Sequence, residues 1–223
     1  HALIWPTEGP AGTRSKSTGK VTLAHIFDAF VCGRNAMPLA PVLQRAFIAL
    51  SLAFTALAPQ AQTLPQETRS LYLQAGADPQ DTRAWTVGLT LPWTDWQRSW
   101  WGGTWRGHWD LYASQWTSDG ATGRVHSTVL GISPALRLRP DQGHSPWFFE
   151  GGIGASYASP RFVTRYKEMS TRFNFVSHLA IGFNHGAAQQ HEWQLRIQHS
   201  SNGGIKKPNP GQNYLQLRYA RHF

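Results

Sequence analysis

The sequence has little that could form a disulfide framework, a helical membrane anchor or a charged, disordered chain. Its 223 residues include one cysteine, and only 15% are charged against 41% hydrophobic. That balance excludes a charged disordered chain. The only notable apolar run, over 47–58, is well short of the roughly 20 residues that a spanning helix needs. We therefore expect one modest domain without a transmembrane helix.

The apolar run has the layout of a secretory signal peptide. Met37 is a candidate start, Arg45 supplies a short positive region, and small and polar residues follow the run. We predict a signal peptide over 37–61, with cleavage near Ala61.

Residues 1–36 precede that methionine and show no sustained period of 2 or 3.6, so we predict that they are non-native or mis-started sequence. Cys32 lies among them, so the predicted mature chain, 62–223, can use neither a disulfide nor a thiol nucleophile. The whole chain has a net charge of +9. A basic surface attracts nucleic acid and anionic lipid head groups equally, so charge alone does not choose between these partners.

Alternating apolar residues recur through the mature chain, whereas no segment there keeps a 3.6-residue period long enough for a helix. In the clearest run, Trp85, Val87, Leu89, Leu91 and Trp93 alternate with small or polar residues. A Pro/Trp/Asp turn region is expected after it. Similar runs occur at 71–75, 105–111, 130–138, 149–157, 173–183, 193–197 and 215–223. The pattern predicts an all-β fold of eight strands.

The opposite face of these strands is ionic. It holds Arg106, His108, Asp110, His178, Glu192, Gln194, Arg196 and Gln198. Because no predicted helix could cover the bulky aromatic face, lipid is its expected cover, which argues against nucleic acid as a partner. A closed barrel satisfies every strand edge, and eight strands leave an interior that side chains can fill. We predict an eight-stranded antiparallel transmembrane β-barrel of the outer-membrane type, plugged by charges that pair with one another.

Aromatic residues mark the predicted ends of the barrel. Five tryptophans bunch around one predicted turn, as amphipathic rings do at a bilayer interface: Trp93, Trp96, Trp100, Trp101 and Trp105. Phe223 ends the chain in phase with the apolar face of the last strand. With an even strand number and both termini in the periplasm, 202–212 becomes the last extracellular loop.

A candidate hydrolytic site follows the seventh predicted strand. His199 and Ser201 continue its apolar face, and their Cα atoms should be roughly 6.5 to 7 Å apart. Ser201 could act as nucleophile with His199 as general base. Asn213, in phase with the apolar face of the last strand, could orient the imidazole. Asn202, Gly203 and Gly204 could supply backbone N–H groups and a side-chain amide for an oxyanion.

These residues also have non-catalytic interpretations. Histidine and serine occur at barrel rims because they are amphipathic. Lys206 and Lys207 fit a solvated loop, or a clamp for the phosphates of an anionic lipid.

The segment from His199 to Gly211 resembles the C-terminal motif of the lipid A 3-O-deacylase (PagL) family, and looser likeness extends back through 98–101 and 107–110. The resemblance implies an eight-stranded outer-membrane barrel with a Ser/His/Glu triad on its outer face. Ser201 matches the nucleophile, His199 the base and Asn202 an asparagine important for activity. The glutamate position falls on Asn213, so we expect this amide to orient His199.

The resemblance implies a serine esterase that removes the 3-linked acyl chain from lipid A, the membrane anchor of lipopolysaccharide, in the outer leaflet. No cofactor or metal is expected. Two alternatives stay open at this point: a non-catalytic barrel that makes contacts through the loop 159–169, and an acyltransferase with a second acyl pocket inside the barrel. Whether the barrel forms a homodimer is also open.

Overall fold

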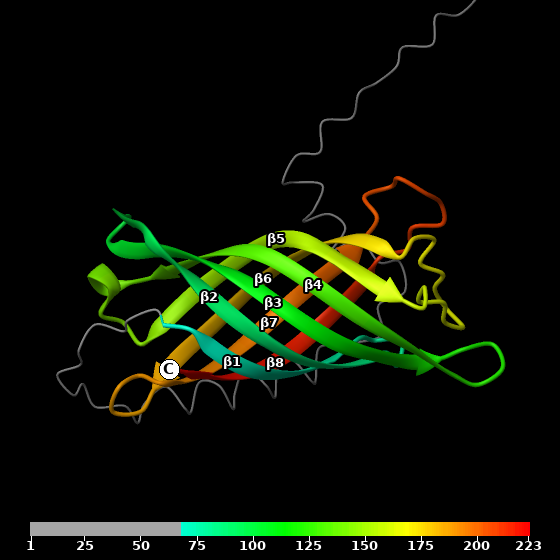
Figure 1. The fold of residues 1–223 in the computed structure, drawn as a ribbon, viewed down its shortest axis with the longest axis horizontal. Helices are drawn as coiled ribbons and strands as arrows, with labels where there is room; N and C mark the ends of the chain where they lie inside the picture. The colour runs from blue at the N-terminus through cyan, green and yellow to red at the C-terminus, as the bar shows by residue number, and fades with distance from the viewer. Residues whose placement is uncertain (1–67) are drawn as a thin grey trace, which may run out of the picture. The chain divides into compact units, whose positions relative to one another are not determined.

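The computed structural model describes residues 68–223, in which eight antiparallel strands form a closed ring in chain order (Figure 1). The strands are β1 (Ser70–Ala77), β2 (Arg83–Trp100), β3 (Gly103–Asp119), β4 (Arg124–Arg139), β5 (Trp147–Ser159), β6 (Phe173–His185), β7 (His191–Ser201) and β8 (Gln212–His222). Pairing of β1 with β8 closes the ring, from Ser70 opposite His222 to Ala77 opposite Leu215. The predicted extension 1–36 and signal peptide 37–61 lie outside the described residues.

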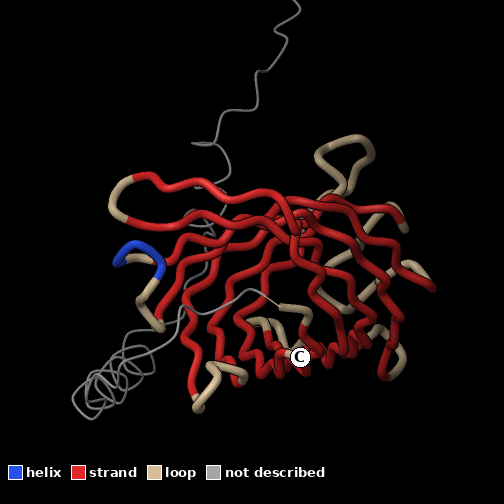
Figure 2. Tube along the Cα trace, turned by 60° about the vertical axis from the view of Figure 1, so that its left-hand side comes forward, coloured by secondary structure: helices blue, strands red, loops and turns tan. Residues whose placement is uncertain are grey.

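Strands make up most of the described chain, and the short 3-10 helix η1 (Asp141–Gly143) joins β4 to β5 (Figure 2). Within residues 68–223, no helix is long and apolar enough to cross a membrane. The predicted all-β architecture and strand number are confirmed.

The outer face of the ring is apolar. Large hydrophobic side chains are exposed on all eight strands, among them Leu73, Val87, Trp109, Ile132, Ile153, Leu179, Leu195 and Leu217. On β7 the exposed residues alternate strictly with buried ones, as the period of 2 predicted. A continuous apolar band of this kind is what a barrel presents to lipid.

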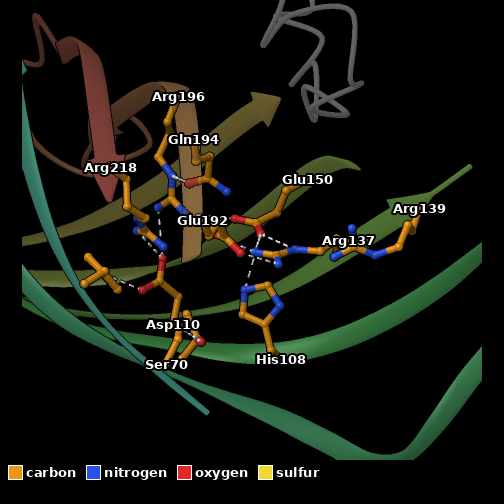
Figure 3. Close-up of polar contacts among 12 residues, drawn as sticks. Ser70, His108, Asp110, Arg137, Arg139, Glu150, Glu192, Gln194, Arg196 and Arg218 are labelled. Atoms are coloured by element: carbon orange, nitrogen blue, oxygen red, sulfur yellow. Dashed lines mark hydrogen bonds and ion pairs between the residues drawn. The ribbon is translucent and has the colours of Figure 1, made fainter. Parts of the chain in front are cut away.

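The interior is filled by a buried network of ion pairs (Figure 3). Arg137 binds both Glu150 and Glu192, each at 2.7 Å. Arg196 bridges Asp110 and Glu150 at 2.9 Å. Since each buried charge has an opposite partner, the desolvation cost of the group is offset within the network. The predicted pairing of interior charges is confirmed.

One end of the barrel also holds an apolar plug that the alternation did not reveal. Phe162 and Met169, from the β5–β6 loop, are buried against Trp116 and Tyr214. The Phe162 ring meets Trp116 edge-on at 5.4 Å between centroids. This loop, considered above as an exposed contact surface, therefore folds partly into the barrel.

The predicted turn region after Trp93 is wrong. Instead, β2 continues to Trp100 through a register shift between Pro92 and Gln97, so the β2–β3 hairpin turns at Trp101 and Gly102. The shift accommodates the β2 residues between Pro92 and Gln97, which have no partner on β3.

The extended hairpin also explains two further placements. Trp100 and Trp101 stack at 4.0 Å between ring centroids and stay exposed, as expected for an interfacial belt. Arg106 was expected inside, but its Nε donates to Gln97 at the exposed part of the hairpin and takes no part in the buried ion-pair network.

Candidate active site on the outer face of β7 and β8

Strand β7 carries His199 and Ser201 on its outward face. Trp193, Leu195 and Ile197 are exposed on this face, whereas the residues between them are buried. His199 and Ser201 continue the same face and are half-buried. The predicted phase is therefore confirmed, and both side chains lie at the end of β7 where it enters the 202–211 loop.

Asn213 lies directly opposite His199 in the β7–β8 register. The imidazole Nδ1 and the Asn213 Oδ1 are 2.6 Å apart. An amide oxygen only accepts hydrogen bonds, so Nδ1 is the donor of this pair, and in a neutral ring the single N–H proton is then on Nδ1 and not on Nε2. The structure thus joins two of the predicted site residues in the tautomer that a general base requires.

A wall of two phenylalanine rings borders Ser201 on its other side. Ser201 is opposite Phe175 in the β6–β7 register. Phe173 and Phe175 meet edge-to-face at 5.4 Å between centroids, and both are exposed on the outer face. Sequence reasoning assigned these rings only to the lipid-facing surface. Two exposed aromatic rings thus lie beside Ser201 on the outer face.

The loop that follows Ser201 is organised around the buried side chain of Asn202. Its Nδ2 donates to Ser170 Oγ at 2.9 Å and to the carbonyl of Lys206 at 2.8 Å. Its Oδ1 accepts from the Gly204 N–H at 2.9 Å, and its own N–H donates to Asn209. The amide considered as an oxyanion donor is therefore engaged inside the loop.

Gly211 lies close to the imidazole of His199 and was not singled out by sequence reasoning. Its φ is +68°, and a Cβ built there would lie 2.7 Å from His199 Cε1. Only glycine meets both conditions without strain. A glycine within an irregular loop carries no local signal of this contact.

The two predicted lysines are exposed above the site. Within residues 68–223, the ammonium groups of Lys206 and Lys207 form no ion pair. By contrast, acidic side chains at the same end of the barrel are paired: Asp78 with Lys167, Asp81 with Arg83, Asp119 with Arg124 and Glu168 with Arg161. Within this part of the chain, the lysines thus leave unpaired positive charge on the loop that follows Ser201.

Among residues 68–223, no cluster of three or more His, Cys, Asp or Glu side chains is arranged to hold a metal. The candidate site described here comprises a hydroxyl, an imidazole and an amide, from Ser201, His199 and Asn213.

The family model described as lipid A 3-O-deacylase (PagL) matches residues 83–222, the range that contains this site. The chain belongs to the lipid A 3-O-deacylase family. The predicted resemblance is confirmed. A PagL barrel of this kind lies in the outer membrane, in agreement with the apolar outer face.

Relatives and a solved structure agree with the family assignment. Lipid A deacylase PagL of Bordetella bronchiseptica is 33% identical over 115 residues, 51% of this chain and 61% of that protein. The chain thus spans about three fifths of that relative. PagL of Pseudomonas aeruginosa is 29% identical over 138 residues, 60% of this chain and 76% of that protein. A crystal structure of the outer membrane enzyme PagL matches with a TM-score of 0.58 and 25% identity, covering 69% of this chain and 99% of that one.

Proposed function

We propose that the protein is a serine esterase that hydrolyses the 3-linked acyl ester of lipid A in the outer leaflet and releases a 3-hydroxy fatty acid. The observation that carries the proposal is the outward-facing line of Ser201, His199 and Asn213, with the His199–Asn213 hydrogen bond already formed. Membership of a family described as lipid A 3-O-deacylase supports the substrate.

The depth of the site supports a lipid ester as substrate. Ile197 pairs with Leu215 as the last apolar pair on the outer face of β7 and β8, and the next outward pair is His199 with Asn213. Across the barrel the outward face of β4 also turns polar, from Leu130 to Thr128. On β7 and β8 the site therefore lies where the apolar band ends. In a lipid, that level is where acyl chains join their head group.

The proposed reaction needs the chain's own side chains and water. His199 Nε2 takes the hydroxyl proton as Ser201 Oγ attacks the ester carbonyl. The imidazolium then gives this proton to the departing sugar oxygen, which leaves as a hydroxyl group. Water, deprotonated by His199, releases the fatty acid and restores Ser201. Asn213 keeps the imidazole in the required tautomer throughout.

We assign the oxyanion to the backbone N–H of Gly203. Gly204 and Asn202 already donate their backbone N–H groups within the loop. Among the described residues, Gly203 N–H forms no hydrogen bond, and its φ of +66° places it in the turn directly after Ser201. A preorganised donor at this place stabilises the negative charge that develops in the transition state. In this assignment Asn202 and Gly204 hold the turn in shape.

Lys206 and Lys207 are proposed to attract the phosphates of the lipid head group. They are exposed above the site and form no ion pair within the described chain. Ammonium groups near an anionic membrane surface contribute about 1 kcal/mol each to its attraction. The buried ion-pair network argues against an internal acyl pocket, and hence against an acyltransferase.

Mass spectrometry of lipid A incubated in detergent with the refolded chain tests the proposal. We expect wild type to remove one 3-hydroxyacyl chain, while Ser201→Ala and His199→Ala each lower the rate by at least about a thousand-fold. Folding of each variant is checked by its mobility on an unheated SDS gel. A folded wild type that leaves lipid A intact would instead favour the non-catalytic barrel.

A further inference from the structure

We infer that Ser170, on the β5–β6 loop, is a positioning residue for the catalytic turn. Its hydroxyl accepts from Asn202 Nδ2 at 2.9 Å and donates to the Lys206 carbonyl at 2.9 Å. Asn202 Nδ2 also donates to that carbonyl at 2.8 Å. The three groups form a closed ring of hydrogen bonds between two loops that are 32 residues apart in sequence.

The Ser170–Asn202 bond of the ring is buried, so water has little access to it. Ser170 is 6% exposed and Asn202 1%. Removing one member leaves a buried polar group without its partner, which costs more than loss of an exposed hydrogen bond. The ring therefore holds Asn202 in one orientation.

Ser170 is itself held by the apolar plug. Met169, the preceding residue, is 2% exposed and packs in the cluster that contains Trp116 and Tyr214. The Met169 N–H also donates to the Phe162 carbonyl at 3.0 Å. The backbone next to Ser170 is thus held by packing inside the barrel, independently of the 202–211 loop that the Ser170 hydroxyl contacts.

Asn202 links Ser170 to the reacting groups, because it bonds to Ser170 and also holds the turn after Ser201. Asn202 directly follows Ser201, and its Oδ1 receives the Gly204 N–H at 2.9 Å. These bonds fix the turn whose Gly203 N–H is assigned to the oxyanion. The inference rests on the proposed function, because that turn affects catalysis only if Ser201 is the nucleophile.

Three variants separate positioning from general support of the loop. Ser170→Ala removes the hydroxyl, and Ser170→Thr retains it. Ser127→Ala is the matched control: Ser127 is also buried, and its Oγ donates to the Pro160 carbonyl at 2.6 Å, at the other end of the same loop. Ser127 has no hydrogen bond to the 202–211 loop among those of the described residues.

The measurements are kcat and KM for lipid A in detergent, together with hydrogen exchange of the Gly204 amide by NMR in the 15N-labelled full chain. We expect Ser170→Ala to lower kcat by roughly ten-fold with little change in KM, since two hydrogen bonds are lost while the Asn202–Lys206 bond persists. Gly204 exchange should accelerate in the same variant. Ser170→Thr should restore both values, and Ser127→Ala should match wild type.

Other outcomes overturn the inference. Equal losses of kcat in Ser170→Ala and Ser127→Ala would mean that the loop gives only general support. Unchanged kcat and exchange in Ser170→Ala would remove the role altogether. If wild type itself does not hydrolyse lipid A but Gly204 exchange depends on Ser170, the proposed function fails while the ordering of the turn by Ser170 stands.

Discussion

Asn213 holds the imidazole of His199 by a hydrogen bond of 2.6 Å between Oδ1 and Nδ1, on the lipid-facing side of the barrel. An amide fixes the tautomer as a carboxylate would, but it does not carry the negative charge that stabilises an imidazolium. In the proposed triad, Asn213 thus supplies the hydrogen bond of the third member without its negative charge.

Substitution of Asn213 should separate these two contributions. We expect Asn213→Ala to lower kcat about ten-fold, through loss of the hydrogen bond, and Asn213→Glu to raise it about ten-fold, because charge-assisted bonds are roughly twice as strong. The rate of fatty acid release measures both, with Leu215→Ala on the same face as the control. A normal rate in Asn213→Ala would show that the amide does not orient His199.

Gly211 should prove sensitive to the addition of a single methyl group. Gly211→Ala places a Cβ 2.7 Å from His199 Cε1, so the imidazole must shift, and we expect kcat to fall at least about ten-fold. Gly102→Ala is the control, because Gly102 has the same φ of +68° but nothing within 4 Å of its Cβ position. Both variants should lose about 1 kcal/mol of stability from backbone strain. Equal activities would rule out the contact with His199 as a constraint.

The buried ion-pair network should dominate the stability of the barrel. Asp110→Asn leaves Arg196 and Arg218 without the carboxylate that both bind at 2.9 Å, and we expect unfolding to become easier by about 3 to 5 kcal/mol. Asp81→Asn breaks an exposed pair with Arg83 at 3.7 Å and should cost about 0 to 1 kcal/mol. Urea unfolding of the refolded protein, followed by gel mobility, gives both values. Similar losses would mean that the network contributes little.

The phenylalanine wall should affect substrate binding more than chemistry. Phe175→Ala removes the ring next to Ser201, and we expect KM to rise roughly three- to ten-fold with kcat nearly constant. Trp85→Ala is the control, since Trp85 is an exposed aromatic on β2, four strands away around the ring. An equal rise in KM for both variants would indicate general contact with lipid and not a contact at the site.

Features that repeat locally could be predicted from the sequence. The period of 2 placed His199 and Ser201 in phase with Ile197, and Asn213 in phase with Leu215, which is where the structure has them. Side-chain alternation is a property of each strand by itself. For that reason the outward site and the ionic interior followed from the chain alone.

Features that depend on contacts between distant segments could not be predicted. Ser170 reaches Asn202 across 32 residues, and Phe162 enters the barrel from a loop without periodicity. The continuation of β2 past Pro92 was also hidden, because proline and clustered tryptophans are typical of a turn, whereas here the strand accommodates them by a register shift.

Strand β8 closes the ring against β1 and also supplies Asn213 to His199. The site is therefore incomplete while the last strand is undocked, whatever the state of β7. If the proposed function holds, a chain whose β8 has not docked has Ser201 and His199 without the amide that orients the imidazole, and is expected to hydrolyse lipid A more slowly than the closed barrel.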